Sequence, residues 1–178
     1  MHKRRIDMAL INVAGGFAVI GSYALGLSAN AGRGDELWGG VPEALRPIYT
    51  GSMLLATSGY FAFTSYFFTR LDPDHACFGT RRGLGTVNFL YALVLASAAL
   101  WMPLTWRMID APSEPVWWAV RLVLGITGGG SLALLGMLLR VQPKSPRGHY
   151  VAAVAGLAAF CFQTAVLDAL IWPAYFRD

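Results

Sequence analysis

Charged residues are scarce in this sequence. They make up 13% of its 178 residues, whereas hydrophobic residues make up 56%. A soluble domain carries roughly 25% charged residues, because its surface has to be solvated. The scarcity therefore excludes an ordinary soluble globular fold and favours a chain that lies in a membrane, with membrane lipid as a partner.

Cysteine and histidine are also rare. Cys77 lies in a predicted loop and Cys161 inside an apolar stretch, so a disulfide between them is not expected. His2, His75 and His149 lie at or beyond the predicted helix ends, and no pair of them can ligate a haem inside a bundle. No zinc-ligand spacing, phosphate-binding loop or nucleophile elbow occurs. We therefore expect neither an obligatory cofactor nor an enzymatic activity.

Five long stretches hold almost no charge, and prolines mark the breaks between them. Each stretch is long enough for a helical crossing, which needs about 20 apolar residues. The sequence predicts an all-α fold, a polytopic membrane protein whose single domain, residues 1–178, is a bundle of five transmembrane helices. We place these helices at about 7–29, 47–69, 84–105, 116–140 and 150–172.

The formal net charge of +4 comes from basic residues scattered over short loops. They form no stripe with interleaved aromatic residues, which excludes nucleic acid as a partner. Nine of them lie at helix ends on the amino-terminal side of the bundle and four at the opposite ends. Because positively charged loops stay in the cytoplasm, we expect the N-terminus inside and the C-terminus outside.

Small residues recur at helical spacing in three of the predicted helices. Gly125 and Gly129 form a GxxxG pair, and Gly26 and Gly156 belong to similar patterns. In lipid such residues allow close approach of helix backbones. They predict tight packing within the bundle or the seam of a homodimer.

Two ionisable residues lie well inside predicted spans. Arg121 and Asp168 are about six and four residues below the same end of the bundle, at depths of roughly 9 and 6 Å. Buried charge in lipid needs a partner or a wet cavity. We expect the two to face each other, either as a structural ion pair or as the polar anchor of a ligand cavity.

All six tryptophans fall in the outer half of the predicted bundle or in its outer loops. An interfacial belt explains tryptophan at headgroup level, but a symmetric belt would also place some at the inner ends. The alternative is an aromatic-walled pocket for a flat apolar ligand. The aromatic and polar residues at this depth include Tyr23, Trp38, Tyr49, Trp101, Trp106, Trp117, Trp118, Gln163 and Trp172.

Several short segments, in order along the chain, resemble motifs of the translocator protein family, also called tryptophan-rich sensory proteins. They are Arg46-Pro47-Ile48-Tyr49-Thr50-Gly51, Ser58-Gly59-Tyr60, Trp101-Met102-Pro103, Val120-Arg121-Leu122-Val123-Leu124, Gln142-Pro143, and Asp168 with Trp172. Three departures stand out: Leu104 replaces a second proline, Arg121 an acid and Asp168 an amide. The resemblance implies five helices and a long first loop over a cavity that binds porphyrins, sterols or similar molecules.

Together these patterns predict a binding or sensory protein for a flat hydrophobic small molecule, such as a porphyrin, a sterol or a carotenoid-like lipid. The ligand is expected between the first, second and fifth helices, beneath the first loop. The candidate ligand-binding residues are Tyr23, Trp38, Pro42, Tyr49, Trp101, Pro103, Trp106, Trp118, Arg121, Gln163, Asp168 and Trp172. A structural or accessory subunit of a larger membrane complex is the alternative, and a small transporter is less well supported.

Overall fold

The computed structural model describes residues 3–70 and 83–176, which are almost entirely helical and include no β-strand. The long helices are α1 (Lys3–Ala29), α2 (Arg46–Ser65), α3 (Gly83–Asp110), α4 (Glu114–Arg140) and α5 (Arg147–Cys161). Two π-helical segments continue them: η3 (Tyr66–Arg70) extends α2, and η4 (Phe162–Ile171) joins α5 to α6 (Trp172–Phe176). The first loop contains two short 3-10 helices, η1 (Gly34–Trp38) and η2 (Glu43–Leu45). All five predicted helices are present.

Four helices are long and apolar enough to cross a membrane, as expected of an integral membrane protein. They are Lys3–Ala29, Gly83–Asp110, Glu114–Arg140 and the continuous rod Arg147–Phe176. The rod formed by α2 and η3 is not among them. Its length is sufficient, but serine, threonine, glycine and tyrosine lower the mean hydropathy of the stretch. Length and composition therefore support four spans rather than the five expected.

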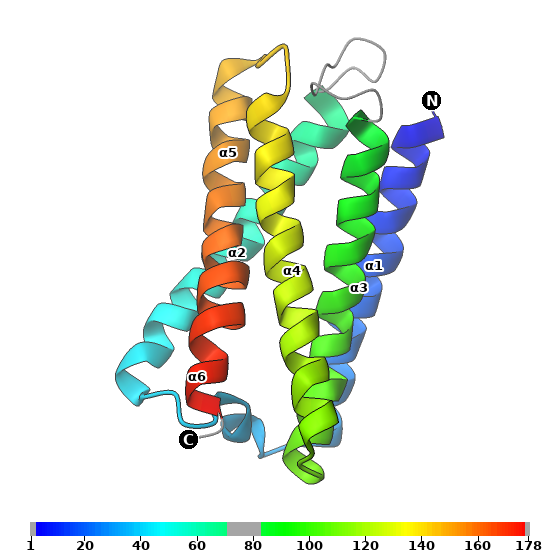
Figure 1. Ribbon diagram of the computed structural model, residues 1–178. Coiled ribbons are helices and arrows are strands. Elements are labelled where there is room, and N and C mark those ends of the chain that lie inside the picture. Colours follow the sequence, from blue (N-terminus) through cyan, green and yellow to red (C-terminus); the bar gives the residue numbers. More distant parts are fainter. Residues whose placement is uncertain (1–2, 71–82, 177–178) are drawn as a thin grey trace.

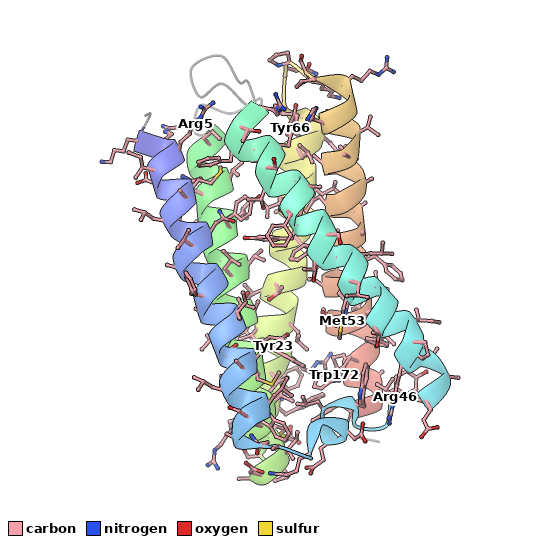
Figure 2. The ribbon with its side chains drawn as sticks, turned by 180° about the vertical axis from the view of Figure 1, so that it is seen from behind. Arg5, Tyr23, Arg46, Met53, Tyr66 and Trp172 are labelled. Atoms are coloured by element: carbon pink, nitrogen blue, oxygen red, sulfur yellow. The ribbon has the colours of Figure 1, made fainter. Side chains whose placement is uncertain are left out.

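The helices pack in an order that differs from their order in the chain. α1 packs on α3, α3 on α4, α4 on α5 and η4, and α5 on α2. The consecutive helices α1 and α2 approach each other near the amino-terminal end of α1, where Tyr60 donates a hydrogen bond to Asn12 and η3 reaches α1. From there they diverge toward the end of the bundle that carries the first loop (Figure 2), which we call the loop end. The oblique course of α2 is visible in Figure 1.

Glycines set the closest helix crossings. A Cβ atom at Gly59 of α2 would lie 2.3 Å from the carbonyl oxygen of Gly156 on α5, so the two backbones touch. A Cβ atom at Gly26 would lie 2.5 Å from the Met102 side chain on α3. By contrast, Gly125 and Gly129 have open space where a side chain would go. The predicted GxxxG pair of α4 therefore faces away from the bundle, while Gly26 and Gly156 pack inside it as expected.

Candidate functional site

Aromatic side chains from separate parts of the chain meet at the loop end. The Trp101 ring on α3 lies 5.6 Å from the Tyr23 ring on α1 and 5.8 Å from the Trp172 ring on α6. Trp38 of the first loop meets Tyr49 of α2 edge-on, with ring centroids 5.8 Å apart. The Trp101–Trp172 and Trp38–Tyr49 pairs are edge-to-face, at interplanar angles of 73° and 85°, which is a favoured geometry for aromatic rings. Five of the predicted ligand-binding residues thus belong to neighbouring ring pairs.

Two side chains next to this cluster keep much of their surface exposed where α1 and α2 diverge. Tyr23 remains 39% exposed although its ring contacts Trp101, and Met53 on α2 is 43% exposed. Met53 lies seven residues before Tyr60, so it shares the helix face that contacts α1. Figure 2 shows Tyr23, Met53 and Trp172 around the gap between α1 and α2. We call this region the side opening.

A polar pair lies behind the rings. The Gln163 amide donates a hydrogen bond of 2.7 Å to the Asp168 carboxylate, and Asp168 is within electrostatic reach of both Tyr23 and Tyr49. In an α-helix, residues five apart point about 140° away from each other. The π-helical turns of η4 bring them onto one side, because their hydrogen bonds join residues five apart. This pairing requires the local change of helix type.

Two buried polar atoms near this pair have no hydrogen-bond partner among the described residues. They are the indole nitrogen of Trp101, which can only donate, and the side-chain oxygen of Gln163, which can only accept. A buried polar atom without a partner costs about 1–3 kcal/mol. Both atoms lie below the surface, so a ligand would reach them only if the rings around them moved.

The expected pairing of Arg121 with Asp168 is wrong. Arg121 lies on the outward face of α4, where its guanidinium is 5.2 Å from the ring of Trp118, itself 60% exposed. The inward face of α4 carries Trp117 and Val120 instead. A cation over an indole ring is stabilised without a carboxylate, and a long arginine can extend to the headgroup region. Arg121 and Trp118 therefore do not belong to the site.

Three other predicted residues also lie outside the site. Pro103 is exposed on the outward face of α3, which it shares with Leu100 and Arg107. Pro42 is exposed in the first loop, just before η2. Trp106 is buried, but its indole packs against Gly26 and so fills the contact between α1 and α3.

Hydrogen bonds to α6 hold the first loop against the loop end. The indole nitrogen of Trp172 donates to the carbonyl oxygen of Leu37 at 2.9 Å, and the amide of Gly40 donates to the carbonyl oxygen of Tyr175 at 2.9 Å. Gly39 adopts a positive φ of 54° and lies directly against the backbone of Phe176. These contacts hold Trp38 beside Tyr49 at the loop end.

An exposed ion-pair network strengthens this attachment. Arg33 donates to both oxygens of Glu36 at 2.7 and 2.8 Å and to Asp110 of α3 at 3.0 Å, while its guanidinium lies 5.3 Å from the Trp106 ring. The hydrogen bonds from Arg33 lower the pKa of Glu36 below its ordinary value. Since the folded-state pKa is the lower one, this contribution is present at neutral pH and is lost as the pH falls through that pKa.

Replacing Gly39 by alanine should detach the first loop. A side chain at this residue meets a strained backbone conformation and the Phe176 backbone, where a Cβ would lie 2.8 Å from Cα. We expect a glutamyl endopeptidase to cleave after Glu36 or Glu43 about tenfold faster, which corresponds to ~1.4 kcal/mol of lost attachment. Gly34→Ala is the matched control, because its Cβ has open space. Equal cleavage rates in the two variants would show that the loop is not held through Gly39.

Two residues of the site were not predicted. Met53 gave no sequence signal beyond its helical register with Tyr60. Phe176 lies four residues after Trp172, a spacing that places both rings on one face, and their centroids are 4.2 Å apart. Phe176 also stacks on Trp117 at 5.8 Å with an interplanar angle of 10°.

Among residues 3–70 and 83–176, no group of three or more histidine, cysteine, aspartate or glutamate side chains is placed to hold a metal ion. A run of possible ligands in the sequence, Asp72, Asp74 and His75, lies outside the described residues. Comparison of the chain with protein-family models, with curated proteins and with solved structures gives no match.

Proposed function

We propose that this chain is a membrane receptor that binds a flat hydrophobic small molecule through the side opening. The observation that carries the proposal is the exposure of Tyr23 between α1 and α2, in front of the Trp101 and Trp172 rings. A site reached between two helices receives its ligand from the lipid, where such molecules are concentrated. The ligand class is porphyrin-, sterol- or carotenoid-like.

Aromatic walls favour a flat ligand, because a planar molecule can bury its whole face against rings by offset stacking. The unpartnered atoms of Trp101 and Gln163 favour a ligand with one polar edge. A hydroxyl or a protonated carboxyl group can accept from the indole and donate to the amide oxygen. The segments that resemble the translocator protein family support the same ligand class.

The proposal is tested by titrating the purified protein with protoporphyrin. The tryptophan fluorescence should be quenched saturably, because Trp101 and Trp172 line the site. Tyr23→Ala should weaken binding about tenfold, the equivalent of ~1.4 kcal/mol. Leu25→Ala is the control, since Leu25 is an exposed apolar residue two positions on and faces elsewhere. If both changes weaken binding equally, or if neither weakens it, the ligand binds away from α1.

The proposal includes a fifth membrane crossing by the α2–η3 rod, with the N-terminus inside. Extensive packing of α2 along α5, itself part of an apolar span, supports this crossing. The Lys3 end of α1 and the Phe176 end of α6 lie at opposite ends of the bundle (Figure 1). Helix α2 is not apolar enough to count as a span by composition alone, as expected for a helix that borders a site with polar groups.

Terminal tags test this topology. A reporter fused at the N-terminus and the same reporter fused at the C-terminus should be found on opposite faces of the membrane, with the N-terminal one inside. Protease protection of each tag in sealed vesicles measures the result. Both tags on one face would mean an even number of crossings and would remove α2 from the membrane.

A further inference from the structure

A second site lies at the other end of α1, far from the side opening. It is a groove of about 920 Å³ between the first turns of α1 and of α3. Its polar lining comes from Arg4, Asp7 and Asn88, and its apolar lining includes Leu10 and Phe89. The volume falls within the range of about 300–1,000 Å³ that is typical of small-molecule sites.

Asn88 carries an unused acceptor in this groove. The residue is only 7% exposed, and its amide nitrogen donates to the carbonyl oxygen of Arg4 at 3.0 Å. That bond fixes the orientation of the amide, so its oxygen is the atom left without a partner. An amide oxygen only accepts hydrogen bonds, so a small shift of this buried side chain would let it accept one from a ligand in the groove.

Charges of both signs lie beside this acceptor. Arg4 and Asp7 are three residues apart on α1 and line the same groove. They lie within roughly 6 Å of the start of the helix, at the depth where lipid headgroups meet the hydrocarbon. Leu10 and Phe89 continue the groove toward the centre of the membrane. The arrangement is polar at the headgroup level and apolar below it.

We propose that the groove binds one phospholipid whose headgroup carries a phosphate, a primary ammonium and no further charge, that is, a phosphoethanolamine lipid. The phosphate accepts from Arg4. The ammonium has three N–H donors and pairs with the Asp7 carboxylate and the free oxygen of Asn88. One acyl chain lies along Leu10 and Phe89. A phosphocholine headgroup has no N–H group that could donate a hydrogen bond to Asn88. A phosphoglycerol headgroup has no cation that could pair with Asp7.

Native mass spectrometry with three lipids of identical acyl chains tests this assignment. The protein should retain one phosphatidylethanolamine about tenfold more strongly than phosphatidylcholine or phosphatidylglycerol, since of the three only its headgroup brings a cation with N–H donors to Asp7. Asp7→Asn should abolish the preference. Glu43→Gln, an equal charge change in the first loop, should keep it. Equal retention of the three lipids, or an unchanged preference in Asp7→Asn, would overturn the proposal.

Filling the groove gives a second test that leaves its polar groups intact. Gly85 contributes to the lining, and a Cβ there would meet open space, so leucine fits without displacing the backbone. Gly85→Leu should lose the bound lipid. Its thermal stability should stay near that of the control Gly125→Leu, whose new side chain enters open space on the outward face of α4. Retention of the lipid by Gly85→Leu at wild-type strength would show that it binds elsewhere.

Discussion

Gly59→Ala should destabilise the protein by about 3 kcal/mol or more, whereas Gly51→Ala in the same helix should not. At Gly59 the added methyl group would lie 2.3 Å from the Gly156 carbonyl oxygen and 2.8 Å from its Cα, and backbone cannot move aside as a side chain can. Overpacking of this kind costs about 1–3 kcal/mol, and more where the helices must separate. Because α2 packs mainly on α5, its position depends on this crossing.

Gly51→Ala is the control, because it should leave the stability unchanged or raise it slightly. Its Cβ would meet nothing within 4 Å, so alanine adds helix propensity of up to about 1 kcal/mol without a clash. Thermal unfolding in one detergent is the measurement. For a chain of this size we expect the midpoint to fall by about 6–12 °C in Gly59→Ala and to stay level or rise slightly in Gly51→Ala. Equal midpoints would mean that α2 and α5 do not touch at Gly59.

Met53→Trp should block the side opening and weaken protoporphyrin binding by tenfold or more, about 1.4 kcal/mol at least. Met53 is half-exposed and faces the gap between α1 and α2. An indole there takes up the room that a ligand needs in front of Tyr23, and it does so without removing any residue of the aromatic wall. The change should leave the unfolding midpoint nearly unaltered, because the side chain is not part of the core.

Leu55→Trp is the matched control for this substitution. Leu55 is two residues further along α2, about 200° around the helix, and is exposed on the face turned away from α1. An indole there adds the same volume to a surface that meets lipid. We expect wild-type affinity from it. A loss of affinity in both variants would assign the effect to α2 as a whole rather than to the side opening.

Hydropathy alone predicted the five rods, because lipid imposes long runs of apolar residues whatever the packing. It also placed Trp101 and Trp172 at one end of the bundle, since depth along a helix follows directly from residue number. Rotation about the helix axis is harder to predict. Arg121 was expected inside because a charge in lipid needs a partner, yet the side of α4 that it shares with Gly125 faces outward. A small residue permits a close contact but does not require one.

Two features depend on local backbone geometry that the sequence pattern does not reveal. Gln163 and Asp168 meet only because η4 is π-helical, whereas sequence periodicity assumes the α-helical repeat. The first loop docks through the positive φ of Gly39, which is one glycine among 20 in the chain. The groove beside Asn88 was also missed, since its lining comes from two helices whose relative position sets which side chains meet.

The most direct test of the proposed ligand site compares the protoporphyrin affinity of Met53→Trp with that of Leu55→Trp in lipid nanodiscs. The shift of the porphyrin absorbance band reports binding without interference from the added tryptophan. We predict a dissociation constant at least tenfold higher for Met53→Trp and an unchanged one for Leu55→Trp. Identical, wild-type affinities in the two variants would contradict entry and binding between α1 and α2.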